Sequence, residues 1–288
     1  MNLVSTTDNY LNLYLSLPKL SPDMVLFIFF LTIARILPLM AVVPFLGAKN
    51  LPMIVRMMFG IALTTIFLPQ NLLMFKSANT FQHPYLLLML KELTVGAVLA
   101  FLASAPFFIA QMAGSLIDHS RGSSALQVTD PTTQSQTGPI GILYNYVLLA
   151  VFFSLNGPFF FFNGLADSYQ VLPVDSLLPA TFFYEGAVFW KKISTLAQSM
   201  FSLSVQIAAP SLIGILLTDL FLGIANRLAP QVQIVFLGMS LKSWVGIAMI
   251  AAAWALIFRV MGSESIAWMK TINAWIATWS ASTNSVAL

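Results

Sequence analysis

The sequence lacks cysteine, has only two histidines and carries few charged residues. The absence of cysteine excludes disulfides and thiolate metal sites. His83 and His119 have no second histidine or cysteine at ligand spacing, so we expect no metal site. Charged residues make up 8% of the 288 positions, against roughly 25% in a soluble globular domain. So few charges cannot solvate the surface of a soluble fold, which predicts an integral membrane protein.

The charges that are present exclude further classes of protein. The net charge of +3 comes from 13 Lys and Arg residues spread singly along the chain. A nucleic-acid surface needs a basic stripe or patch, so we expect no nucleic-acid partner. No H-E-x-x-H, Walker or G-x-G-x-x-G pattern occurs. The chain therefore has no nucleotide site of its own, and we expect no cofactor.

Hydrophobic residues make up 58% of the chain, and the mean hydropathy is +0.86. Crossing about 30 Å of hydrocarbon takes roughly 20 apolar residues, and such segments must be helical to pair their backbone in lipid. The prediction is an all-α membrane protein with about six long helices arranged as kinked hairpins, in one membrane-embedded domain over 1–288. The expected spans are Met24–Leu46, Pro52–Met74, Tyr85–Ala113, Ile142–Phe162, Leu196–Ala225 and Val232–Val260.

Shorter segments outside these spans are expected at the membrane interface. Residues 1–23 lack the features of a cleaved signal peptide, and Met1–Leu20 is predicted to be an amphipathic lead-in. Asn163–Trp190 is predicted to be an ordered interfacial loop that holds a short helix. The tail, Gly262–Leu288, places tryptophans near helical spacing, which predicts an interfacial helix; a subunit-packing helix is the alternative.

Two of the expected spans contain charged residues and prolines, which are unfavourable in a helix surrounded only by lipid. The third contains Lys91 and Glu92, and a lipid-facing charge costs roughly 2.5–3.5 kcal/mol on insertion scales. Gly96, Ala100 and Ser104 follow at four-residue spacing, a stripe that lets another helix approach closely. That stripe is consistent with packing inside the chain and with a subunit contact. The first span carries Arg35 with Pro38 and Pro44, and proline kinks a helix.

The segment Gly114–Gly141 is a polar island between apolar runs. A patternless loop longer than about 15 residues is usually functional or disordered. Asp118, His119 and Ser120 are adjacent, and neighbours in sequence rarely meet in triad geometry; no G-x-S-x-G elbow occurs either. We therefore expect no catalysis here. From the residues alone, a solvated connection and a functional loop both remain open.

A second group of polar residues lies around the last predicted hairpin: Asp219, Asn226, Arg227, Pro230, Gln231 and Lys242. They have two interpretations. In the first, the charges cap helix ends at the membrane surface. In the second, they form inter-subunit ion pairs along a polar path.

Three places in the chain together carry a family resemblance. The first is Gly114-x-x-Ile117-Asp118 through Gly122, with Asp130-Pro131. The second is the Ser/Thr/Gln run that follows and leads into Gly138-Pro139. The third is Pro210 to Asp219, with Asn226-Arg227-x-Ala229-Pro230-Gln231 and Lys242 downstream. Together they resemble the T subunit family of the type III secretion export apparatus (SctT), which is homologous to the flagellar biosynthetic protein FliR. The resemblance covers nearly the whole chain in length and hydrophobic layout.

That resemblance implies a subunit of an export gate in the bacterial inner membrane. The implied partners are R-type, S-type and U-type subunits, with unfolded secreted proteins as transient substrates. It also implies that the loop from Asp118 to about Gly138 plugs the pore. The positions expected to act in the plug are Asp118, Arg121, Gly122, Leu126, Val128, Asp130, Pro131 and Gly138.

The residues of the island suit a closure that must open. Gly122 and Gly138 are expected to supply permissive backbone, and Pro131 resists helix continuation. Leu126 and Val128 are expected to anchor the loop, each worth about 1.5–3 kcal/mol when buried.

The alternative is a stand-alone secondary transporter that works through Arg35, Lys91, Glu92 and Asp219. An intramembrane enzyme lacks a plausible nucleophile and base.

Overall fold

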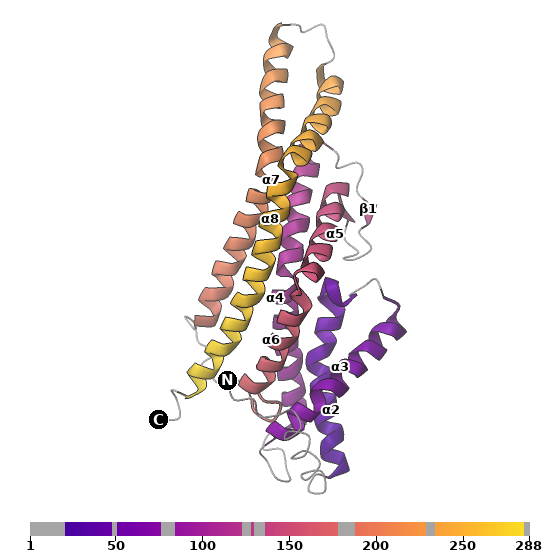
Figure 1. The fold of residues 1–288 in the computed structure, drawn as a ribbon, viewed down its shortest axis with the longest axis vertical. Helices are drawn as coiled ribbons and strands as arrows, with labels where there is room; N and C mark the ends of the chain where they lie inside the picture. The colour runs from indigo at the N-terminus through magenta and orange to yellow at the C-terminus, as the bar shows by residue number, and fades with distance from the viewer. Residues whose placement is uncertain are drawn as a thin grey trace. The chain divides into compact units, whose positions relative to one another are not determined.

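The computed structural model describes residues 21–47, 51–75, 84–122, 128–129, 136–177, 188–228 and 234–284. These residues are almost entirely helical, which confirms the all-α prediction (Figure 1). The helices are α2 (Pro22–Val42), the 3-10 turn η2 (Pro44–Leu46), α3 (Met53–Met74), α4 (Tyr85–Ser120), α5 (Pro139–Ser154), α6 (Gly157–Val171), α7 (Val188–Leu228) and α8 (Ile234–Asn284). A two-residue strand pair, β1 (Val128–Thr129) and β2 (Gln136–Thr137), lies between α4 and α5.

Five helical segments within these described ranges are long and apolar enough to cross a membrane. They are Pro22–Val42, Met53–Met74, Tyr85–Ser120, Ser194–Leu228 and Gly238–Ala274; the pair formed by α5 and α6, which is bent at its short break, would make a sixth. The prediction of about six long apolar helices is confirmed, and the chain is an integral membrane protein.

Several expected boundaries were wrong, and α4, for example, runs to Ser120 and not to the expected Ala113. Ile142–Phe162 is not one helix, because the chain breaks at Leu155–Asn156, where Asn156 takes the left-handed φ of 57°. The segment expected to be a loop from Asn163 instead continues α6 to Val171. The tail is not a separate helix, because α8 runs without a break from Ile234 to Asn284. The N-terminal lead-in, Met1–Leu20, lies outside the described residues.

The chain divides into two compact units, each built from separate stretches of sequence. The first unit comprises residues 1–104, 158–187 and 269–288, and the second comprises residues 105–157 and 188–268. A single membrane-embedded domain over 1–288 stays a prediction.

In the first unit, α2 packs against α3 and closely against α4. A Cβ on Gly96 would collide with the backbone carbonyl of Arg35, so these two helices touch at the backbone. Ala100 is fully buried, and the Ser104 hydroxyl donates to the carbonyl of Val42 at 3.4 Å. The small-residue stripe of α4 is therefore used within the chain.

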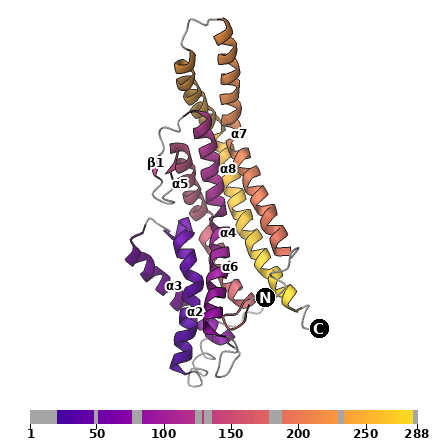
Figure 2. The same ribbon diagram turned by 180° about the vertical axis from the view of Figure 1, so that it is seen from behind.

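In the second unit, α7 and α8 form the predicted antiparallel hairpin, and they lie side by side in both views (Figures 1 and 2). Ser211 donates to the carbonyl of Gly246 at 3.3 Å, and Asp219 pairs with Lys242 further along. The end of α4 packs equally closely on the start of α5, since a Cβ on Gly114 would collide with the backbone of Gly141.

Candidate functional site

Asp118, near the end of α4, joins the two helices that flank the polar island. Its carboxylate accepts hydrogen bonds from the backbone N–H groups of Ile140, at 2.9 Å, and Gly141, at 3.3 Å. These groups lie in the first turn of α5, where N–H groups have no partner within the helix and favour a negative charge. Asp118 therefore caps a helix that begins 21 residues later in the sequence, and it brings together the two ends of the loop.

Arg121 connects this cap to α8. Its guanidinium forms an ion pair with Asp118, one turn earlier in the chain, and donates to the Ser243 hydroxyl at 3.2 Å. Asp118 and Arg121 are only 3% and 6% exposed. A charge pair shielded from water in this way interacts more strongly than a surface pair. We call Asp118, Arg121 and Ser243 the loop clasp.

The two glycines at the base of the loop serve different purposes. Gly122 has a φ of 78°, in the left-handed region that favours glycine, as expected for a permissive position. Gly138 has a φ of −73°, which any residue adopts. A Cβ on Gly138 would instead collide with the Asp118 carboxylate. The explanation by permissive backbone was therefore wrong for Gly138, whose requirement is space beside Asp118.

The loop between these glycines contains a short antiparallel ladder. Val128 pairs with Thr137, and Thr129 pairs with Gln136. Sequence reasoning predicted no regular structure in this stretch. Three further predicted positions, Leu126, Asp130 and Pro131, lie outside the described residues.

The charged residues of the last hairpin are only partly brought together. Asp219 of α7 forms an ion pair with Lys242 of α8, and both side chains are in contact with solvent. Asn226 and Arg227 are exposed near the end of α7. Pro230 and Gln231 fall in the part of the chain that is not described. Both interpretations of this group stay predictions.

A second buried polar cluster occupies the first unit. Arg35 donates to both carboxylate oxygens of Glu92, at 2.5 Å and 2.9 Å, and also to the Ser168 hydroxyl and the Leu172 carbonyl. Lys91 contacts Glu92 at 2.5 Å and donates to the Pro173 carbonyl at 2.7 Å. The cluster therefore ties α2 and α4 to the end of α6.

This second cluster is almost completely shielded from water. Arg35 and Glu92 are fully buried, and Lys91 is 4% exposed. The Arg35 guanidinium lies 4.2 Å above the Tyr169 ring, a cation–π contact. Burial of these charges is tolerated because each of them has an ionic partner and hydrogen bonds.

The sequence identified the charged residues of both clusters as candidates, but it did not predict which of them pair. The i, i+3 spacing of Asp118 and Arg121 on one helix was a usable signal for an ion pair. Ser243 carried no such signal, because its part in the loop clasp depends on the packing of α8 beside α4.

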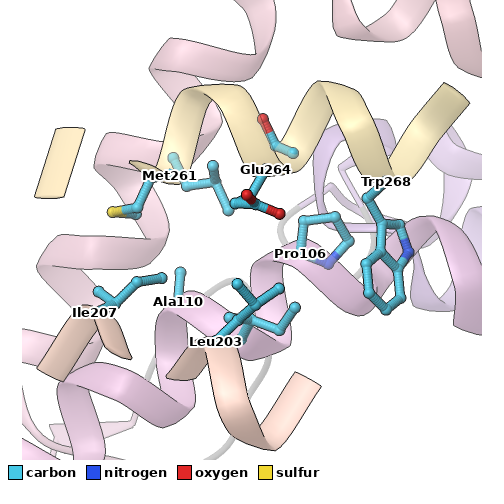
Figure 3. Close-up of a pocket in the computed structure, with 10 residues that line it drawn as sticks. Pro106, Ala110, Leu203, Ile207, Met261, Glu264 and Trp268 are labelled. Carbon is cyan, nitrogen blue, oxygen red and sulfur yellow. The ribbon is translucent and has the colours of Figure 1, made fainter. Parts of the chain in front are cut away.

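A small pocket in the second unit is lined by α4, α5, α7 and α8, almost entirely by apolar side chains. Figure 3 shows the Glu264 carboxylate turned toward Pro106 and Leu203, with Trp268 at one end. Within the described ranges, no group of three or more His, Cys, Asp or Glu side chains is arranged to hold a metal ion. A single exposed carboxylate among apolar groups provides no acid–base pair.

Long apolar helices, buried ion pairs and a polar loop clasped at its base define a polytopic integral membrane protein. Residues 26–266 match the family described as "Bacterial export proteins, family 1". The chain belongs to this family.

Named relatives fall in two groups. The chain is 31% identical to the flagellar biosynthetic protein FliR of Bacillus subtilis over 254 residues, which cover 86% of this chain and 94% of the relative. It is 32% identical to the secretion system apparatus protein SsaT of Salmonella typhimurium over 161 residues, covering 56% of this chain and 60% of that protein. The Yop proteins translocation protein T of Yersinia pestis is 31% identical over 158 residues, covering 55% and 59%. Flagellar and secretion proteins are therefore both among its relatives, as the sequence resemblance predicted.

Proposed function

We propose that this chain is a core subunit of a type III export gate in the bacterial inner membrane. In this role it forms part of the pore through which unfolded proteins cross. The observation that carries the proposal is the family match over residues 26–266, together with relatives named as secretion and translocation proteins. The partners in this proposal are the R-type, S-type and U-type subunits.

The surface of the second unit supports a role in an assembly. Helix α7 exposes a series of large apolar side chains at helical spacing: Ile213, Leu216, Leu217, Leu220, Phe221 and Ile224. Among the residues that the structure describes, none covers this face. Contiguous apolar surface of this kind marks contact with lipid or with other proteins.

We also propose that the loop from Asp118 to about Gly138 plugs the pore at rest. Its two ends are fixed together because Asp118 of α4 caps α5. A loop held at its base is able to change its path without unfolding the helices that carry it. Its many Ser, Thr and Gln residues exchange hydrogen bonds with water at low cost.

Deleting Gly122–Gln136 tests the plug, because the deletion leaves Asp118, Arg121 and Gly138 in place. The expected result is a complex that assembles normally but conducts small ions when reconstituted in a bilayer. Conductance equal to that of the intact complex would show that the loop is not a closure.

The stand-alone transporter makes a different prediction. Its proposed charges Arg35, Lys91 and Glu92 already have partners in the buried cluster, which favours a structural role for them. We expect the tagged chain, extracted in mild detergent, to be recovered with other small hydrophobic subunits. Recovery as a monomer or dimer that alone catalyses solute uptake in liposomes, with loss on Asp219→Asn, would reject the export-gate proposal.

A further inference from the structure

The exposed side chains of the α7–α8 hairpin change in polarity along its length. The register of the two antiparallel helices is set by contacts between them: Ser211 donates to the carbonyl of Gly246, and Asp219 pairs with Lys242. In this register residues 203–218 of α7 lie beside residues 243–258 of α8. We call these two stretches, both of which the structure describes in full, the apolar belt.

Both helices present an apolar surface within the belt. Every exposed side chain of α8 between residues 243 and 258 is apolar, and besides alanines they are Trp244, Ile247, Trp254, Leu256 and Phe258. Between residues 203 and 218, α7 exposes Val205, Ile213, Leu216, Leu217 and one polar side chain, Gln206. The Gln206 amide donates to the Ser202 hydroxyl at 3.3 Å, so the helix itself meets part of its need for hydrogen bonds.

Polar groups mark both ends of the belt, at matching levels on the two helices. At one end lies the ion pair between Asp219 and Lys242, which is in contact with solvent. At the other end, Ser202 of α7 and Arg259 of α8 are both exposed. Past this second end, toward the base of the hairpin, the exposed surface becomes largely polar, with Lys191, Ser194, Thr195 and Gln198 on α7 and Ser263 and Glu264 on α8.

Helix α5 repeats this pattern within the same unit. Its start is capped by Asp118, whose ionic partner Arg121 meets Ser243 at one end of the belt. Its end lies near the other limit, because a Cβ on Gly262 would be 3.4 Å from Cδ1 of Leu155. Over residues 140–153, all of them described, the side chains that α5 exposes are Leu143, Tyr146, Ala150 and Phe153. A third helix therefore has an apolar outer surface between the same two levels.

The length of the belt fits the hydrocarbon layer of a bilayer. At a rise of 1.5 Å per residue, Ser202 and Asp219 lie about 26 Å apart along α7, and Lys242 and Arg259 lie equally far apart along α8. The hydrocarbon is about 30 Å thick, and long cationic side chains extend toward its edges. Trp244, next to the Lys242 end, is a residue favoured at headgroup level. The whole of α7, with 41 residues, is about 60 Å long and exceeds this thickness about two-fold.

We propose that the bilayer surrounds the second unit at the apolar belt, with phospholipid acyl chains covering it. The base of the hairpin, residues 191–202 and 259–268, lies in water. A common pair of limits on three helices favours lipid over a protein partner, because a flat layer begins and ends at the same level on every helix. Apolar side chains beyond Asp219, such as Phe221 and Ile224, lie outside this lipid zone and stay open to partner subunits. The inference goes beyond the export-gate proposal and requires neither a pore nor a plug.

Spin-label accessibility tests this placement, because the chain has no cysteine of its own. Single cysteines replace small exposed residues: Ala251→Cys and Ala255→Cys lie in the belt, and Ala197→Cys and Ser263→Cys lie in the base and serve as matched controls. Each variant of the full chain is purified with the subunits that accompany it, labelled with a nitroxide and reconstituted in phospholipid bilayers. Collisions of the label with dissolved oxygen report lipid, and collisions with a water-soluble nickel complex report water.

The expected result is a reversal between the two pairs of positions. Labels at 251 and 255 should be accessible to oxygen and shielded from nickel, and labels at 197 and 263 should be accessible to nickel. Labels at 251 and 255 that are shielded from both reagents would show that a protein covers the belt, and would overturn the inference. Oxygen access without nickel access at 197 and 263 would also overturn it, because the bilayer would then cover the base. Either failure leaves the export-gate proposal standing, since recovery with other subunits judges that proposal separately.

Discussion

Arg35 of α2 and Glu92 of α4 form a two-pronged ion pair in which both side chains are fully buried. Because Lys91 shares the same carboxylate, Glu92 balances two cations. We therefore expect Glu92→Gln to be more damaging than Arg35→Met. The first substitution leaves two buried cations without an anion, whereas the second leaves Glu92 paired with Lys91.

Breaking a buried pair by removing one partner costs roughly 3–5 kcal/mol, and Glu92→Gln is expected to reach that range. The measurement is the thermal stability of the detergent-extracted protein, with expression level as a second readout. Equal losses for the two variants would show that Lys91 does not share in the balance of charge.

The contact between α2 and α4 predicts that Gly96→Ala destabilises the first unit. The added methyl group would collide with the Arg35 carbonyl, a backbone atom that cannot rotate away. Overpacking of this kind costs typically about 1–3 kcal/mol. Gly60→Ala is the matched control, since its nearest neighbour would be Met40 Cγ at an ordinary 3.6 Å. Identical melting of the two variants would contradict the close approach.

Much of this organisation follows from residue patterns. For the parts that the patterns did not predict, the reasons can be identified. Long apolar runs predicted the spans, although α5 begins at Pro139 and not at the expected Ile142. The break before α6 had a local signal in Asn156-Gly157-Pro158, but the apolar run around it concealed it. The pairs Arg35–Glu92 and Arg121–Ser243 join residues 57 and 122 positions apart. Such contacts depend on how helices pack and not on local spacing.

The packing of Gly138 against Asp118 predicts a specific non-additivity. Gly138→Ala alone displaces the carboxylate and is expected to cost about 1–3 kcal/mol through overpacking. In an Asp118→Ala background the methyl group meets no carboxylate but would still lie 2.6 Å from the Cβ of residue 118, so its cost should fall without disappearing. A double-mutant cycle on the thermal stability of the complex measures this coupling. Additive effects would show that the two residues do not touch.

The pair between Asp219 and Lys242 is expected to contribute little to the stability of the chain. Its side chains are 44% and 26% exposed, and exposed pairs are worth roughly 0–1 kcal/mol. Asp219→Asn should therefore leave the melting temperature nearly unchanged. Secretion measured for the same variant separates the two interpretations of Asp219. Normal secretion would identify a surface ion pair. Loss of secretion with an unchanged melting temperature would identify a contact in the assembly.

We propose that unfolded proteins pass the loop between α4 and α5 as they cross the membrane. The most direct measurement places a photo-crosslinking amino acid at His119, an exposed position at the end of α4, in a complex that holds a stalled secretion substrate. A matched probe at Thr65, an exposed position of α3, serves as the control. The account predicts crosslinks to the substrate from His119 and none from Thr65. Absence of substrate crosslinks at His119 in a complex that demonstrably holds the stalled chain would contradict it.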